Sequence, residues 1–181
     1  MATHVREGHS VDIVAVVLRQ HQQIRDLCRA VTAANPSARA RPFDDVRARL
    51  TAHEAAEQAV VRPSTLETAG ESKVGDREAE ERAIKEELLD IGQLPPGTEE
   101  FGIKFSHLAD VIGHHFEAEE REELPYLLTR YTSAERERLG RSFLRATRWA
   151  PTDPASIFAA PRATHSLLGP VSALLHRRRD D

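Results

Sequence analysis

The sequence predicts an all-α protein, an antiparallel up-down four-helix bundle with a C-terminal helical extension. Proline and glycine divide its 181 residues into segments of helical length. Within these segments, apolar residues recur three and four residues apart, as on a helix that buries one face. No segment alternates between apolar and polar residues as a half-buried β-strand does. Four such segments joined by loops favour a bundle of antiparallel neighbours.

The bundle helices are expected between the prolines of the N-terminal two thirds of the chain. They cover about residues 11–34, 43–61, 76–91 and 99–124. Pro36, Pro63, Pro95 and Pro125 follow them in turn, and a proline inside a helix removes a backbone hydrogen bond. We therefore expect each helix to end before its proline, and residues 62–75 to form a loop.

The rest of the chain is expected to add helices to this bundle. A fifth helix fits residues 133–148, residues 151–161 form a connector rich in proline and alanine, and a short terminal helix fits residues 163–176. We therefore divide the chain into a bundle domain over residues 11–130 and C-terminal helices over residues 131–181 that pack on it.

Composition narrows the classes of function. The net charge is −4 and no basic face precedes Arg177–Arg179, so we expect no binding of nucleic acid. The lone Cys28 supports neither a disulfide framework nor a cysteine-based zinc site. Met1–Ser10 is polar, unlike a signal peptide, and no segment has the ~20 apolar residues of a membrane span. We expect a cytoplasmic protein that is a monomer or a weak homo-oligomer.

Histidines and glutamates interrupt the apolar stripes of all four bundle helices. A buried carboxylate without a partner is unfavourable, and several together repel one another. Two cations that bind the carboxylates and the imidazoles would remove both penalties, so the pattern predicts a dinuclear metal site. The interrupting residues are His21, His53, Glu57, Glu81, His115 and Glu119.

Two of the helices carry the same motif, His-x3-Glu-x5-Pro. Residues four apart lie on one face of a helix, so the histidine could bind one metal while the glutamate bridges to a second. Imidazole and carboxylate ligands suit iron or manganese. A single histidine in a core is more often only hydrogen-bonded, but a repeated pair favours metal binding. The motif occurs 62 residues apart, as His53, Glu57, Pro63 and as His115, Glu119, Pro125.

With these motifs the sequence resembles the hemerythrin-like (HHE cation-binding) family over about residues 11–130. The resemblance lies in LRQHQQI around His21, LTAHEAAEQ around His53 and GHHFEAEEREELP around His115. It implies an up-down four-helix bundle that holds two iron ions, oxo- or hydroxo-bridged, with manganese as an alternative metal. By position it implies bridging carboxylates and terminal histidines. The implied bridges are Glu57 and Glu119, and the implied terminal ligands are His21, His53 and His115.

The third helix departs from the family pattern, which usually places histidines there. The matching stretch, REAEERAIKEEL, offers Glu78 and Glu81 instead. Glu81 is on the stripe and is expected to bind metal, with Glu78 as a second candidate. The site would then be richer in carboxylate than an oxygen carrier and closer to ferritin-like di-iron sites. Because anionic ligands stabilise the higher oxidation state of iron, redox chemistry is favoured over reversible oxygen carriage.

Three functions are compatible with these expectations. The first is a di-iron oxidoreductase, peroxidase- or oxidase-like, that reacts with O2, peroxide or nitric oxide in stress defence. The second is binding or sensing of O2, nitric oxide or iron without turnover, and the third is a structural bundle with a degenerate site. The expected partner is a small diatomic ligand or peroxide, and no catalytic residue is expected beyond the metal ligands.

Overall fold

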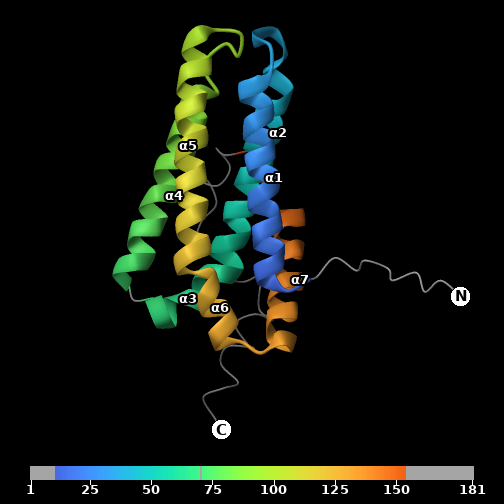
Figure 1. Ribbon diagram of the computed structural model, residues 1–181, viewed down its shortest axis with the longest axis vertical. Coiled ribbons are helices and arrows are strands. Elements are labelled where there is room, and N and C mark those ends of the chain that lie inside the picture. Colours follow the sequence, from blue (N-terminus) through green and yellow to red (C-terminus); the bar gives the residue numbers. More distant parts are fainter. Residues whose placement is uncertain (1–10, 70, 154–181) are drawn as a thin grey trace, which may run out of the picture.

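The computed structural model describes residues 11–69 and 71–153, which form helices joined by short connections (Figure 1). No strand occurs in these two stretches, so the predicted all-α class is confirmed. The elements are α1 (Ile13–Ala33), the 3₁₀ turn η1 (Pro36–Ala38), α2 (Ala40–Ala56), the π-helical turn η2 (Glu57–Val61), α3 (Arg62–Ala69), α4 (Glu71–Ile91), α5 (Glu99–Glu122), α6 (Leu124–Arg130) and α7 (Ser133–Trp149).

The long helices α1, α2, α4 and α5 form the predicted up-down bundle. Figure 1 shows them aligned with the long axis of the molecule, and the chain reverses direction from each one to the next. Helix α1 packs against α2 and α5, and α4 packs against both of the same neighbours, which closes the ring. Side-chain caps fix where the helices begin: Asp12 accepts a hydrogen bond from the Val14 backbone N–H, and Thr98 accepts one from Phe101.

Two of the prolines expected to follow helix ends lie in the first turns of further short helices, α3 and α6. Pro63 is in the first turn of α3, and the predicted loop over residues 62–75 is wrong, because it holds α3 and the start of α4. Pro125 is in the first turn of α6. Proline is tolerated in a first turn, where the N–H that it lacks would have no helical partner. The wide turn η2 and the break at Glu123 give the two prolines such a position.

Helix α7, expected over residues 133–148, packs against α1 and α2. A capping box between Thr132 and Glu135 begins it. At Gly140 a Cβ would stand 1.8 Å from the carbonyl oxygen of Val11, so only glycine allows this close approach. The terminal helix predicted over residues 163–176 lies outside the described residues, as does most of the predicted connector.

The core consists of two apolar clusters. The first includes Ile24, Leu50, Ile112 and Phe116, and the second includes Val17, Ala56, Val60 and Leu124. About two helical turns separate the clusters along α1, from Val17 to Ile24, and polar side chains fill this layer. None of the helices over residues 11–69 and 71–153 is both long and apolar enough to cross a membrane.

Candidate metal centre

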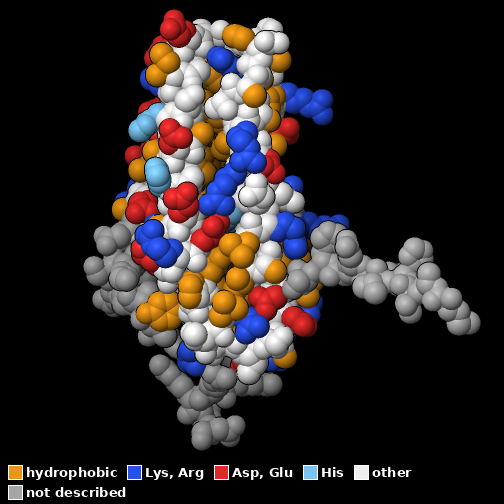
Figure 2. Space-filling view, in the orientation of Figure 1, with side chains coloured by type: hydrophobic (Ala, Val, Ile, Leu, Met, Phe, Trp, Pro, Cys, Tyr) orange, Lys and Arg blue, Asp and Glu red, His pale blue; other side chains and the backbone are white. Residues whose placement is uncertain are grey.

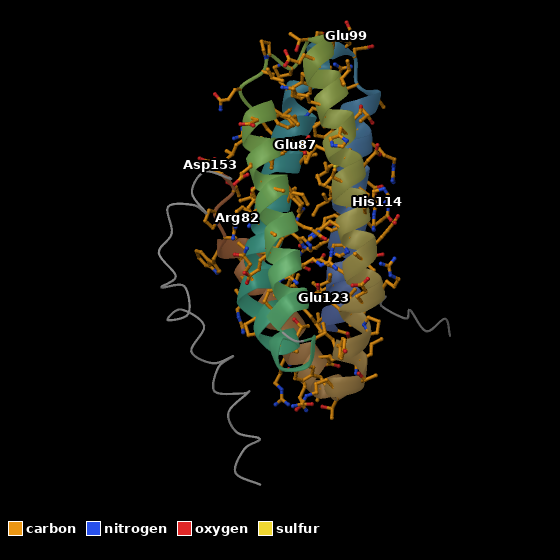
Figure 3. All side chains as sticks on the ribbon, turned by 90° about the vertical axis from the view of Figure 1, so that its left-hand side faces the viewer. Arg82, Glu87, Glu99, His114, Glu123 and Asp153 are labelled. Carbon is orange, nitrogen blue, oxygen red and sulfur yellow. The ribbon has the colours of Figure 1, made fainter. Side chains whose placement is uncertain are left out.

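Three histidines and four glutamates converge in the layer between the apolar clusters, and all seven are buried. Figure 3 shows nitrogen and oxygen atoms gathered inside the bundle near the level of Arg82 and Glu123. Within each of two groups, the ligand atoms lie within 4.8 Å of one another. The first ligand group is His21, His53, Glu57 and Glu119, and the second ligand group is Glu54, Glu81 and His115.

The Glu119 carboxylate faces both groups. Its Oε2 atom lies 3.5 Å from His21 Nε2, and its Oε1 atom lies 3.3 Å from His115 Nε2. Glu57 Oε1 lies 3.5 Å from His53 Nε2 and 3.8 Å from His21 Nε2. These separations are longer than good hydrogen bonds, so the nitrogen and oxygen atoms surround a common space without bonding one another well.

Each of the three imidazoles is held from its outer side. His21 Nδ1–H donates to Glu120 at 2.8 Å, and Arg25 donates to the same oxygen. Figure 2 shows basic and acidic side chains mixed along the line between α1 and α5, where this ion pair lies. His53 Nδ1–H donates to Gln20 and His115 Nδ1–H to Glu80, each at 3.2 Å. These bonds leave Nε2 of each ring facing inward as a potential metal ligand, as is usual for metal-bound histidine.

The inward-facing atoms have no hydrogen-bond partners. They are Nε2 of the three histidines, both carboxylate oxygens of Glu54, and Oε2 of Glu57 and of Glu119. A buried polar atom without a partner destabilises a fold, and a bound cation would give these atoms a common partner. Imidazole nitrogens and carboxylate oxygens are together the donor set of iron and manganese sites. The residues present therefore fit a pair of divalent cations.

Without a cation, burial suppresses charge in the first ligand group. Burial lowers the pKa of His21 to about 4, although Glu120 favours its charged form. Burial also raises the pKa of Glu57 to about 8, with the Glu54 charge adding to the effect. The pKa of Glu119 is raised for the same reason, by burial and then by Glu57. Neutral imidazoles are what metal binding requires, whereas the carboxylic acids must release protons when a cation binds.

The second ligand group behaves differently because it contains an ion pair. Burial alone would raise the pKa of Glu54, but its contact with His115 lowers that pKa to about 2. Burial alone would lower the pKa of His115, but Glu54 and Glu119 raise it to about 10. Without metal, His115 therefore carries a proton that a cation would have to displace.

The structure brings six of the seven predicted ligands together and adds Glu54. Glu78, the second candidate on the third helix, is exposed on α4 and belongs to neither group. Glu54 was not expected because it lies one residue off the stripe of α2. That helix packs against both α1 and α4, so two consecutive residues, His53 and Glu54, both face the interior. The dipeptide His-Glu in LTAHEAAEQ is the only sequence sign of it.

Arg62 is also part of the site and was not expected there. Its side chain is only 4% exposed and contacts three glutamates: Glu81, Glu119 at 3.1 Å and Glu123 at 2.6 Å. The cause is the π-helical turn η2, in which the Arg62 N–H bonds to the carbonyl of Glu57, five residues earlier. In a regular α-helix, residues five apart point about 140° away from each other. The wider turn brings Arg62 back to the face that holds Glu57.

Comparison with known proteins agrees with this fold. Residues 12–127 match the family model described as the Hemerythrin HHE cation binding domain. This chain is similar to the crystal structure of a hemerythrin HHE cation binding domain-containing protein from Mycobacterium kansasii, with a TM-score of 0.69 and 21% sequence identity. The match covers 85% of this chain and 94% of the Mycobacterium kansasii chain. No curated protein matches the chain. The chain thus belongs to the hemerythrin HHE cation-binding domain family.

Proposed function

We propose that this protein holds two iron ions between its two ligand groups and uses them for redox chemistry with O2, peroxide or nitric oxide. The observation that carries the proposal is the set of buried, inward-facing nitrogen and oxygen atoms that have no partner. Bound iron would supply the electron transfer to the small oxidant, and manganese is the alternative metal. The protein side chains position the metals, set their charge and limit the access of water.

The ligands divide between the two metals by position. His21 and His53 would bind the first metal, and the second ligand group would bind the second. Glu119 faces histidines of both groups and is the best-placed bridge. Glu57 lies beside both first-group histidines, and the charges of Glu54 and Glu81 in the second group also act on it, so it would be the other carboxylate shared between the metals.

The balance of ligands favours redox chemistry over reversible oxygen carriage. Four buried glutamates face three histidines, and anionic oxygen donors stabilise ferric iron more than neutral imidazoles do. In addition, Glu120 and Glu80 accept the outer N–H of two of these imidazoles, which makes the rings better electron donors. Such a site should oxidise readily and should not return easily to a diferrous state with O2 released.

Aromatic rings shield the first metal position from water. Phe116 stacks on the His21 ring with a centroid distance of 4.0 Å and an interplanar angle of 5°. The same ring lies nearly perpendicular to the His53 ring at a centroid distance of 5.5 Å, and the Phe143 ring of α7 lies 5.7 Å from His53. A low-dielectric wall of this kind strengthens the binding of cations by the carboxylates.

Iron content and peroxide turnover test the proposal. Protein purified with iron should contain about two irons per chain, absorb in the near ultraviolet as a bridged ferric pair does, and consume peroxide. His115→Ala should sharply reduce the iron content, whereas the adjacent, exposed His114→Ala should leave it unchanged. Equal losses in both variants, or purified protein that binds no transition metal, would overturn the assignment.

One observation favours sensing without turnover as a second candidate. Gln20, which accepts the His53 N–H, also donates to Thr147 of α7 at 3.5 Å, so the metal centre is linked to the helix outside the bundle. A change in the metal could reach α7 through this link. Reversible spectral changes with O2 or nitric oxide, without consumption of peroxide, would support this candidate against the first.

A further inference from the structure

The two ligand groups differ in how free their atoms are. In the first ligand group, both histidine Nε2 atoms, Glu57 Oε2 and Glu119 Oε2 have no partner. In the second, Glu54 and His115 Nε2 also have no partner, but both oxygens of Glu81 are engaged, Oε1 by Arg62 and Oε2 by the Gln58 side-chain amide at 2.9 Å. Arg62 also donates to Glu119 Oε1, which is the oxygen nearest to His115. The first position is therefore open to a cation, and the second is partly occupied by a guanidinium.

Arg62 cannot give up this place to water, because the π-helical turn η2 points it into the core. Its Nε atom is buried without a partner, so the side chain is held by its contacts with glutamates alone. One of these glutamates lies outside the two ligand groups. Glu123 accepts from Arg62 at 2.6 Å and is itself held by Arg77 at 3.0 Å, at the edge of the site.

We propose that Arg62 sets the order in which the two metal positions fill. The first ligand group binds its cation first, and the second group binds one only when the guanidinium releases Glu81 and Glu119 and keeps its bond to Glu123. This inference rests on the proposed metal centre and concerns how that centre is loaded. Arg62 is thus an internal cation that holds the carboxylates in place before metal arrives and competes with the second metal for them afterwards.

Titration of the metal-free full-length chain with Mn²⁺ tests the inference, by calorimetry and by electron paramagnetic resonance, which distinguishes isolated from coupled Mn²⁺ ions. We expect the wild type to bind in two unequal steps, with isolated ions at one Mn²⁺ per chain. In Arg62→Met the second step should tighten by about tenfold or more, equivalent to about 1.4 kcal/mol, and coupled ions should appear earlier. A wild type with only one step should gain the second in this variant.

A second variant gives the opposite expectation. Glu123→Gln removes the charge that holds Arg62 when it leaves the ligands, so the second step should become weaker. Arg82→Met, which removes a positive charge at an exposed position beside Glu81, serves as the control and should change neither step (Figure 3). If circular dichroism shows that Arg62→Met does not fold, the second binding step of Glu123→Gln tests the inference by itself.

The inference and the proposed function fail in different ways. Two Mn²⁺ steps that are the same in the wild type, Arg62→Met and Glu123→Gln would overturn the role of Arg62 and leave the metal centre intact. A weaker second step in Arg62→Met would also overturn it. A wild-type chain that binds neither Mn²⁺ nor iron would instead overturn the proposed metal centre.

Discussion

Glu54 and Glu57 are three residues apart on the same helical path, yet their protonation differs. Both are buried, but Glu54 lies beside His115, whose positive charge lowers the pKa of Glu54 to about 2. Glu57 has no such cation in direct contact, and burial together with the charge of Glu54 raises its pKa to about 8. The identity of a residue therefore says little about its charge in this core, and its immediate partners decide it.

Replacing Glu54 by glutamine tests its place among the ligands. The amide has nearly the same shape but lacks the charge, so the proposed second metal position should lose a ligand while the fold is retained. We expect the iron content of Glu54→Gln to fall from about two to about one per chain, measured by atomic emission. Glu78→Gln, on an exposed residue of α4, should keep the wild-type content. Iron loss in Glu78→Gln but not in Glu54→Gln would reverse the assignment.

The protonation of the site without metal also predicts how stability depends on pH. The pKa values of Glu57 and His115 are raised from ordinary values of 4.5 and 6.5 to about 8 and 10. Raised values stabilise the fold at low pH, and this contribution is lost as pH rises through them. Between pH 7 and pH 9 the melting temperature of the metal-free protein should therefore fall. Protein loaded with Mn²⁺ should show a smaller fall, and a rising melting temperature of the metal-free form would contradict this reasoning.

At the scale of the element, regular helices explain which site residues the sequence predicts, and the turn η2 explains which one it does not. The three histidines were predictable because each interrupts an apolar stripe of regular helical period. Arg62 was not, since five residues after Glu57 a regular helix would point it to solvent, and the spacing alone does not reveal a π-helical turn. The sequence also predicts a helix end at Pro63, because it does not reveal the π-helical turn that precedes this proline. The remaining helix boundaries followed closely from proline, glycine and capping residues.

Deleting one residue distinguishes a π-helical turn from an ordinary one. Removal of Ala59 from η2 should restore regular α-helical spacing while Glu57 and Arg62 stay on one face, four residues apart. We expect this variant to keep most of its metal binding, with some loss of stability because Pro63 would then lie in a regular helix. Removal of Ala48 from α2 should rotate the ligands by about 100° and abolish binding. Equal metal contents in the two deletion variants would contradict this account.

At the scale of the whole molecule, α7 supports the site although it lies outside the four-helix bundle. It covers α1 and α2, places Phe143 near His53 and binds Gln20 through Thr147. The sequence predicted the helix but not its link to the site, since nothing in an amphipathic pattern states which bundle helices it will cover. The close approach at Gly140 is what allows this packing.

Substitution at Gly140 should therefore loosen α7. The added methyl group of Gly140→Ala would clash with the Val11 backbone, and we expect a loss of about 1–3 kcal/mol in the free energy of unfolding. Gly113→Ala is the matched control, because a Cβ there meets no atom within 4 Å on helix α5. That variant should gain up to about 1 kcal/mol, as alanine usually does over glycine in a helix. Urea denaturation measures both, and equal stability of the two variants would speak against the tight contact.

The position of the polar layer between two apolar clusters also bears on how fast metal is exchanged. Hydrocarbon side chains fill the bundle axis on both sides of this layer, so we expect ions to enter and leave between neighbouring helices. On those sides stand half-exposed glutamates, Glu120 beside Arg25 and Glu80 beside Arg77. Transient separation of adjacent helices, and not unfolding of their ends, should then limit the rate at which a chelator removes metal from the protein.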